Sequence, residues 1–341
     1  MKLNRILYFG YYLKQLDREK FSRFLNYVHH ETGKSRMALL KEITSSVFLY
    51  NISLLEYFQF GFYGDNKSER KNWAGTGFMY EYQRLMNPPS SRRILDDKRE
   101  FYKAYQEFFV HKTLTLDAAE ANPELLDEFL HHAIGKLVLK DATGKCGSGV
   151  AVVSNRDFDR QSLLSHMHRH RFDLIEEFLV QHPALQELAP TAVNTVRIFT
   201  QVNARNEVEL LGCRLRIAVD GPVDNMAAGN MAAPIEESTG IINGAAVFSD
   251  ITRQSCETHP VTGVRIWGFQ IPFWQEILTL VERAALKHPQ NRSIGWDVVV
   301  TENGPGLIEG NHDWCKLVWQ LPVNQGLKSI LIKHQQELTK R

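Results

Sequence analysis

Two carboxylates and one amide near the end of the chain have the types and spacing of a cation site. Asp297 stands in the apolar run Gly-Trp-Asp-Val-Val-Val, and a turn at 302–306 leads to a second run that carries Glu309 and Asn311. Because a hairpin of this size pairs the two runs, it brings Asp297 and Glu309 side by side. Mg²⁺ accepts carboxylate and amide oxygens, and nucleotide phosphates would complete its coordination. Acids inside an apolar run need a cation or a partner, which favours metal ligands over surface acids.

A glycine-rich stretch between two short apolar runs has the composition of a phosphate-holding loop. Lys140 ends the first run, and the loop after it contains Gly144, Gly147, Ser148 and Gly149. Glycines let backbone N–H groups approach phosphate oxygens closely, and a lysine supplies a positive charge. No helix with a Gly-Lys-Ser/Thr start follows, so the loop is not a Walker A motif. A plain glycine-rich β-hairpin remains the alternative interpretation.

Three arginines stand in apolar runs between these two motifs. Arg197 lies in Asn-Thr-Val-Arg-Ile-Phe, and Arg214 and Arg216 share one face of a predicted strand because side chains alternate with a period of two. Arginines that point into a site can hold carboxylate or phosphate oxygens with two hydrogen bonds. An exposed charged sheet face is the alternative. A loop of small residues follows, suited to close contact with a ligand, and it contains Asp224, Asn225, Gly229 and Asn230.

The composition indicates a globular chain and excludes several classes of function. The 341 residues are too many for one compact core and predict two or three packed units. Hydrophobic residues make up 43% and the formal charge is +1, which argues against disorder and against nucleic acid as the main partner. Four widely separated cysteines, none in a CxxC pair, fit a reducing compartment. The charged N-terminus does not resemble a signal peptide, so we expect a cytoplasmic protein.

Apolar periodicity predicts an α+β protein in three parts. Residues 1–91 read as a helical cap, and the Asn-Pro-Pro-Ser-Ser stretch at 87–91 is the clearest break. Residues 92–179 and 180–341 mix helices with strands. The apolar stretch 45–64 has one charge but several polar residues, which favours a buried or membrane-grazing helix over a spanning one. Helices are expected at 96–111, 123–133, 272–288 and 324–338, and strands at 136–141, 149–154, 173–180, 195–202, 208–219, 294–301 and 306–309.

In their order along the chain, these motifs resemble an ATP-grasp enzyme. The resemblance is closest to the sugar-transfer-associated ATP-grasp proteins, on the stretches VDNMAAGN, HPVTG, GWDVVV and LIEGN. It is weak before residue 90 and extends from about residue 92 to the end. It implies an ATP-grasp fold, in which two α+β lobes clamp a nucleotide, preceded by an N-terminal helical domain. Of its parts, the Asp297…Glu309-x-Asn311 element combined with the upstream lysine and glycine turn is fairly specific.

The resemblance also implies roles for individual residues. Asp297, Glu309 and Asn311 would be the Mg²⁺ ligands, and Arg197 and Arg216 would steady the transferred phosphoryl group, with Arg214 as a less certain third arginine. The ATP-contacting set would be Lys98, Lys140, Gly144, Gly147, Ser148, Gly149, Glu176, Glu177, Phe178 and Leu179, of which residues 176–179 form the hinge beside the adenine. The substrate side would contain Asn194, Asp224, Asn225, Gly229 and Asn230.

These roles imply an ATP- and Mg²⁺-dependent ligase that joins a carboxylate and an amine through an acyl phosphate. The family's association with polysaccharide genes suggests a sugar acid, such as a hexuronic acid, and an amino acid or another amine as substrates. Two alternatives stay open, namely a non-catalytic nucleotide-binding partner of a glycosyltransferase and an ATP-grasp phosphotransferase.

Two further sequence features have weaker functional interpretations. The N-terminal helices could dock to a membrane surface or a glycosyltransferase, although a lid packed on the catalytic lobes is the favoured interpretation. His166, His168 and His170 could bind a metal, but a solvated basic segment is favoured because no third ligand is evident.

Overall fold

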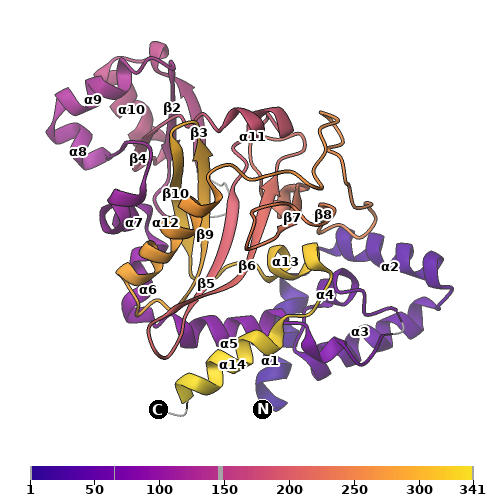
Figure 1. The fold of residues 1–341 in the computed structure, drawn as a ribbon. Coiled ribbons are helices and arrows are strands. Elements are labelled where there is room, and N and C mark those ends of the chain that lie inside the picture. The colour runs from indigo at the N-terminus through magenta and orange to yellow at the C-terminus, as the bar shows by residue number, and fades with distance from the viewer. Residues whose placement is uncertain (1, 65, 145–148, 340–341) are drawn as a thin grey trace.

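The computed structural model describes residues 2–64, 66–144 and 149–339. Its first part is a layer of helices, shown in indigo in Figure 1. Serine and aspartate caps begin several of them, and Ser53 and Glu56 form a reciprocal capping box. An aromatic core that includes Phe24, Tyr57 and Phe58 holds the layer together. The helices are α1 Lys2–Lys14, α2 Arg18–Thr32, α3 Arg36–Tyr50, α4 Leu54–Gln59 and α5 Thr76–Met86.

The apolar stretch at 45–64 forms parts of two helices rather than one. Asn51 ends α3 with a left-handed backbone (φ 58°), and α4 begins after Ser53. The capping asparagine and serine therefore divide the apolar residues between two helices. Within the described ranges, no helix is long and apolar enough to cross a membrane.

A small antiparallel sheet forms the second part, with strand order β1-β4-β2-β3. Helices α8, α9 and α10 cover one face, where Leu137, Leu139 and Ile175 are buried against them. The opposite face carries Lys140 and Glu176, two of the residues predicted to contact ATP. The strands are β1 Thr113–Thr115, β2 Lys136–Lys140, β3 Val150–Ser154 and β4 Leu174–Glu177, and the helices of this part are α6 Pro89–Asp96, α7 Lys98–Tyr105, α8 Leu116–Ala121, α9 Pro123–Leu130 and α10 Arg160–His170.

The third part is a six-stranded antiparallel sheet with strand order β10-β9-β5-β6-β7-β8. On β5, Val196 and Ile198 pack in the core cluster that contains α12, whereas Phe199 packs with α5 and α13 on the other side. The strands are β5 Val196–Val202, β6 Val208–Ile217, β7 Met231–Ile235, β8 Val247–Phe248, β9 Ser293–Thr301 and β10 Gly304–Asn311. The helices are α11 Pro183–Leu188, α12 Trp274–Lys287, α13 Lys316–Gln320 and α14 Lys328–Thr339, and 3-10 turns lie at Arg70–Asn72, Gln106–Phe108, Asn155–Asp157, Met226–Ala228 and Leu321–Val323.

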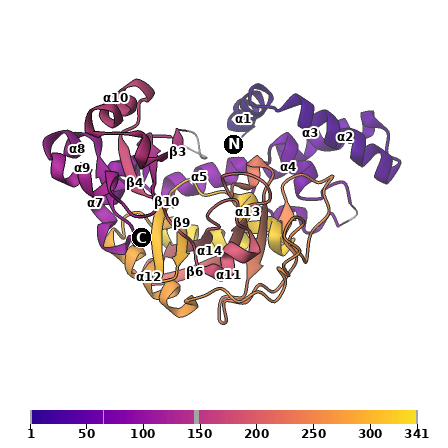
Figure 2. The same cartoon turned by 90° about the horizontal axis from the view of Figure 1, so that it is seen from above.

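The small sheet and the N-terminal helices lie at opposite ends of the large sheet (Figure 2). Helix α5 joins the N-terminal layer to the large sheet, because the Tyr82 hydroxyl donates to the Gln201 side chain at 2.7 Å and the Asn87 amide donates to the Ser293 carbonyl at 2.8 Å. The boundary predicted at residue 91 falls within α6, and that at residue 179 falls in the connection after β4. The α+β architecture with an N-terminal helical region agrees with the sequence prediction.

Candidate active site

The β9–β10 hairpin pairs the two predicted metal-binding acids directly. Asp297 is the register partner of Glu309, and on the other side of β9 it is the partner of Arg197 on β5. The ladder shifts by one residue between Leu307 and Glu309, which marks a β-bulge at Ile308. Because side chains alternate between faces, the extra residue places Glu309, rather than Ile308, beside Asp297. The hairpin therefore presents both carboxylates on one face of the sheet.

Asp297 is enclosed by two arginines. Its carboxylate accepts two hydrogen bonds from Arg197, through Nε and through Nη2 at 2.7 Å, and one from Nη1 of Arg216 at 3.0 Å. Burial by itself would raise the pKa of Asp297, but the two guanidinium groups outweigh burial and hold this pKa well below its usual range. Arg216 also pairs with Asp224 at 2.7 Å. Asp297 is thus ionised and fixed in place.

Glu309 is in a different environment, although it lies next to Asp297. The Asn311 amide donates to its Oε1 at 3.2 Å. Burial and the neighbouring negative charge of Asp297 raise the pKa of Glu309. The protein therefore places too little positive charge near this carboxylate to balance its ionised form. Carboxylate and amide oxygens are the donors that Mg²⁺ prefers. A divalent cation at Glu309 and Asn311 would supply the missing positive charge, and so the residues present fit such an ion.

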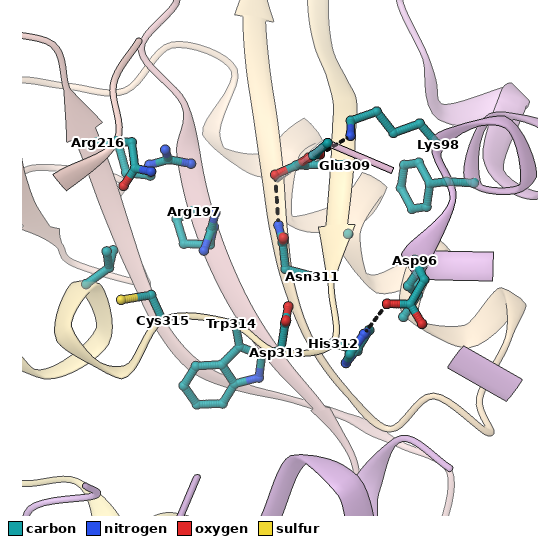
Figure 3. A pocket seen from close by; sticks show the side chains of 16 residues that line it. Asp96, Lys98, Arg197, Arg216, Glu309, Asn311, His312, Asp313, Trp314 and Cys315 are labelled. Atoms are coloured by element: carbon teal, nitrogen blue, oxygen red, sulfur yellow. Dashed lines mark hydrogen bonds and ion pairs between the residues drawn. The ribbon is translucent and has the colours of Figure 1, made fainter. Parts of the chain in front are cut away.

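A cavity of about 200 Å³ opens at these groups. Figure 3 shows Arg197 and Arg216 on one side, Glu309 and Asn311 between, and Lys98 on the other side. The Lys98 ammonium donates to the carbonyls of Gly144 and, at 3.3 Å, Asp141, and burial lowers its pKa. Lys98 therefore ties α7 to the glycine-rich turn at the mouth of the cavity. The lining residues are Leu95, Asp96, Lys98, Phe101, Gly144, Arg197, Arg216, Asn225, Glu309, Gly310, Asn311, His312, Asp313, Trp314, Cys315 and Val318.

The second predicted lysine lies on the small sheet and is paired with an acid of the predicted hinge. Lys140 Nζ is 2.5 Å from Glu176 Oε2, and the His111 ring is 3.5 Å from the same oxygen. Burial opposes ionisation of Glu176, but Lys140 and His111 lower its pKa to about 2. Next to it, Glu177 accepts a hydrogen bond from the Lys112 backbone N–H at 2.8 Å.

This arrangement predicts a specific loss of stability in acid. The folded-state pKa of Glu176 lies below the ordinary value of 4.5, so its ionised form stabilises the fold above that pH, and this stability is lost as the pH falls toward 2. The shift corresponds to about 3 kcal/mol. We expect Glu176→Gln to unfold more easily at neutral pH and to lose less stability on acidification than the wild type. Denaturant titrations between neutral and acid pH would measure this, and parallel curves for the two proteins would contradict it.

The remaining residues predicted to contact ATP are Phe178, Leu179 and those of the glycine-rich loop. Phe178 stacks under the Lys136 ammonium at 5.1 Å, and Leu179 follows it in the connection between the sheets. Gly149 has a left-handed backbone (φ 72°), and a Cβ there would lie 2.7 Å from Asp141 Cβ, which explains the need for glycine. Gly147 and Ser148 lie outside the described residues, so the predicted glycine-rich loop is described only at Gly144 and Gly149.

Among the predicted substrate residues, only Asn225 lines the cavity within the described part of the chain. Asp224 instead accepts from the Thr195 backbone N–H at 2.9 Å and pairs with Arg216. The Asn194 amide is fully buried and donates to Gln181 and to the Ala189 carbonyl. Asn230 braces its own loop by donating to the carbonyls of Val223 and Asn225, and Gly229 forms the left-handed turn before it (φ 92°).

Arg214 is separated from the other arginines by its hydrogen bonds. It shares a sheet face with Arg216, as predicted, but its guanidinium donates to the carbonyl of Trp319 at 2.6 Å and to that of Cys213 at 2.7 Å. Those bonds fasten α13 to β6. Arg214 thus lies between β6 and α13, and it is not among the cavity's lining residues.

Sequence reasoning did not identify the wall formed by α6 and by the turn after β10. There, the His312 ring is 2.7 Å from Asp96, and Asp313, Trp314 and Cys315 line the cavity. In the sequence, only their positions, directly after Asn311 and two residues before Lys98, indicated that these residues belong to the site.

The three histidines at 166–170 do not form a metal site. The rings of His166 and His170 lie 4.4 Å apart, and His168 pairs with Glu120 at 2.6 Å. Across the described residues, no group of three histidine, cysteine or acidic side chains is arranged to hold a metal.

The cavity thus has Glu309 of the β9–β10 hairpin on one wall and Lys98 of α7 facing it. Residues 78–336 match the family described as sugar-transfer associated ATP-grasp, and this chain belongs to that family. The fold and family predicted from the sequence are therefore confirmed. No curated protein sequence is detectably similar.

Several solved structures are similar to this chain at low sequence identity. D-alanine–D-alanine ligase from Bacillus anthracis is 16% identical, with a TM-score of 0.41, over 80% of this chain and 79% of that one. Biotin carboxylase from Campylobacter jejuni is 15% identical, with a TM-score of 0.49, over 77% and 53%. N5-carboxyaminoimidazole ribonucleotide synthetase is 10% identical, with a TM-score of 0.39, over 64% and 45%. The chain thus spans about half the length of two of these proteins.

Proposed function

We propose that this protein is an ADP-forming, ATP-dependent ligase that joins a carboxylate to an amine. The observation that supports this most strongly is the composition of the cavity wall. Glu309 and Asn311 offer oxygen ligands beside the arginine-bound Asp297, and Lys98 faces them from the other lobe. Such a wall suits a Mg²⁺–triphosphate, and the family assignment supports the same conclusion.

Mg²⁺ would be held by Glu309 and Asn311, together with Asp297. When bound, it would neutralise charge on the β- and γ-phosphates and polarise the transferred phosphoryl group. The protein's own contribution is to keep these oxygens in place. The bidentate Arg197 contact fixes the Asp297 carboxylate, and the hairpin register sets Glu309 beside it.

The reaction we propose has two steps, and both rely on positioning rather than on a nucleophilic side chain. A substrate carboxylate oxygen attacks the γ-phosphorus, the bond to the β–γ bridging oxygen breaks, and ADP leaves. Arg216 and Arg197 stabilise negative charge on the phosphoryl group and the acyl phosphate. An amine then attacks the acyl carbon, the bond to the phosphate oxygen breaks, and inorganic phosphate and a proton leave.

The nucleotide would lie between the two sheets. Lys140 and Lys98 would contact its phosphates, together with the glycine-rich loop that begins at Gly144. The backbone of residues 176–179 would read the adenine edge. For the other substrates, we propose a sugar acid such as a hexuronate and an amino acid or similar amine, in surface polysaccharide synthesis in the cytoplasm. The family description, which refers to sugar transfer, supports this choice.

A substrate screen tests the proposal directly. The full chain would be incubated with ATP and Mg²⁺ against a panel of uronic acids and amino acids, and ADP release and product mass would be followed. We expect ADP release that needs both a carboxylate and an amine, together with a product whose mass shows loss of water. ADP release with one substrate and a stable phosphorylated product would instead show a phosphotransferase. Nucleotide binding without turnover across the panel would favour a non-catalytic partner.

Removal of the Lys140 ammonium should weaken nucleotide use and also lower stability, because the buried Glu176 would lose its partner. We expect Lys140→Met to lower kcat/KM for ATP by about a hundredfold, because the variant loses a charge beside the phosphates. Lys287→Met is a matched control, since Lys287 pairs with Glu107 at the surface, away from the cavity. ADP release at varied ATP, with thermal melts of both variants, would measure the effect. Equal activity in the two variants would remove Lys140 from the proposed site.

A further inference from the structure

Helices α1 and α3 expose an unusual share of large apolar side chains. The described part of the chain has 21 exposed large hydrophobic residues, and seven of them are on these two helices, which span only 28 residues. Leu7 is 66% exposed, Met37 76% and Leu49 64%. We name the seven together the α1/α3 surface: Ile6, Leu7, Tyr11, Leu13, Met37, Leu40 and Leu49.

The apolar side chains of α1 point away from the protein. At 100° per residue, Ile6, Leu7, Tyr11 and Leu13 fall within an arc of about 160° on the helix. The opposite side of α1 is anchored to α3, because the rings of Phe9 and Phe48 lie 5.3 Å apart and Arg5 donates to the Leu49 carbonyl at 3.1 Å. Tyr12 is buried on the same anchored side. One side of α1 is therefore packed on α3, and the other side exposes its apolar residues.

The N-terminal residues that include this surface carry an excess of positive charge. Residues 1–50 contain nine lysines and arginines against four acids, a formal charge of +5, which leaves −4 on the other 291 residues. Lys14, Arg36 and Lys41 are exposed on α1 and α3. Glu42 is the acid of these two helices, and it is paired with Lys34 at 3.1 Å and accepts from the Tyr57 hydroxyl at 2.7 Å. The positive charge is thus concentrated where the apolar side chains are exposed.

We propose that the α1/α3 surface binds the interface of an anionic lipid bilayer. A helix pair with apolar residues outward and lysines and arginines beside them can insert its apolar side chains among acyl chains while its cations meet lipid phosphates. Charge complementarity favours an anionic bilayer over a protein groove, because a basic rim adds attraction to every headgroup around the inserted side chains. The catalytic lobes would then act beside the membrane. This inference does not depend on the proposed ligase activity.

Sedimentation with vesicles tests the proposal on the full chain. Vesicles of phosphatidylglycerol with phosphatidylcholine would be compared with vesicles of phosphatidylcholine alone. We expect the protein to sediment with the anionic vesicles, to bind the neutral ones at least tenfold more weakly, and to be released by high salt. Absence of sedimentation with the anionic vesicles would overturn the proposal.

Variants locate the contact on α1. Ile6→Gln with Leu7→Gln keeps good helix formers and removes two exposed apolar groups, so vesicle affinity should fall about tenfold or more. Leu125→Gln with Leu286→Gln is the matched control, because these residues are exposed on α9 and α12. The control should bind like the wild type, and thermal melts should be similar for all three proteins. Equal vesicle binding by both pairs would overturn the proposal, as would a wild-type self-association that the Ile6/Leu7 variant abolishes without any vesicle binding.

Discussion

Replacing Glu309 by glutamine should abolish turnover and leave the fold intact. We expect ADP release to fall by about a hundredfold or more, because the variant lacks an anionic ligand for Mg²⁺. We expect the free energy of unfolding without metal to be unchanged or higher. Burial and the charge of Asp297 raise the pKa of Glu309, so its ionised form is disfavoured in the fold, and an uncharged side chain relieves that cost. Activity assays and denaturant titrations would separate the two effects.

Glu302→Gln provides the control for this experiment. Glu302 is exposed in the turn of the same hairpin, so its substitution should change neither activity nor stability. A second readout is the rise in melting temperature on addition of Mg²⁺ and a non-hydrolysable ATP analogue, which should be present in the wild type and smaller in Glu309→Gln. If the variant unfolds more easily than the wild type without metal, Glu309 has a structural role and the metal assignment weakens.

Replacing Asp297 by asparagine should lower stability as well as activity, unlike the Glu309 substitution. Viewed as a metal ligand alone, Asp297 would be expected to affect activity much more than stability. The structure changes that expectation, because its carboxylate neutralises the buried Arg197 and also contacts Arg216. We expect Asp297→Asn to lower the free energy of unfolding by about 3 kcal/mol, since it leaves two guanidinium groups without their shared anion. Turnover should be lost as well.

Denaturant titration of Asp297→Asn would measure the loss, with Asp220→Asn, an exposed acid, as the control. A double variant, Asp297→Asn with Arg197→Gln, should recover part of the stability, because the guanidinium that lost its anion is gone while Arg216 keeps Asp224. If the single variant is as stable as the wild type, the arginine contacts contribute little to the fold. In that case, the carboxylate would serve ligand binding alone.

Much of the hairpin was predictable because its determinants are local in sequence. The apolar run around Asp297, a turn and the second apolar run together predict two paired strands, which the structure contains, although the turn predicted at 302–306 is only residues 302–303 and Gly304 already begins β10. The surroundings of Asp297 were not predictable in the same way. Arg197 reaches it only because β5 pairs with β9, and the two residues are 100 positions apart in the chain. The sequence predicted Asp297 as a ligand for a metal ion. The pairing of β5 with β9 gives its carboxylate a second role, because it also neutralises Arg197 within the sheet.

Other differences have similar physical causes. Strand β7, Met-Ala-Ala-Pro-Ile at 231–235, has small residues and a proline, and it was not among the predicted strands. It forms a strand because Pro234 lies beyond the two residues that pair with β8, where no ladder hydrogen bond is required of it. Likewise, Arg214 and Arg216 share a face of the sheet but differ in role. The cause is the Trp319 carbonyl, far along the chain, which accepts a hydrogen bond from Arg214.

The extra residue at position 308 determines which side chains of β10 face the site and which face the other side of the sheet. Without it, Ile308 would be the neighbour of Asp297, and the carboxylate that follows would be directed toward the hydrophobic helix behind the sheet. Related sequences should therefore be aligned backward from the Glu-Gly-Asn triplet, not forward from the turn. A relative with one residue fewer in this strand would keep the same letters and yet present an aliphatic side chain where the cation is expected.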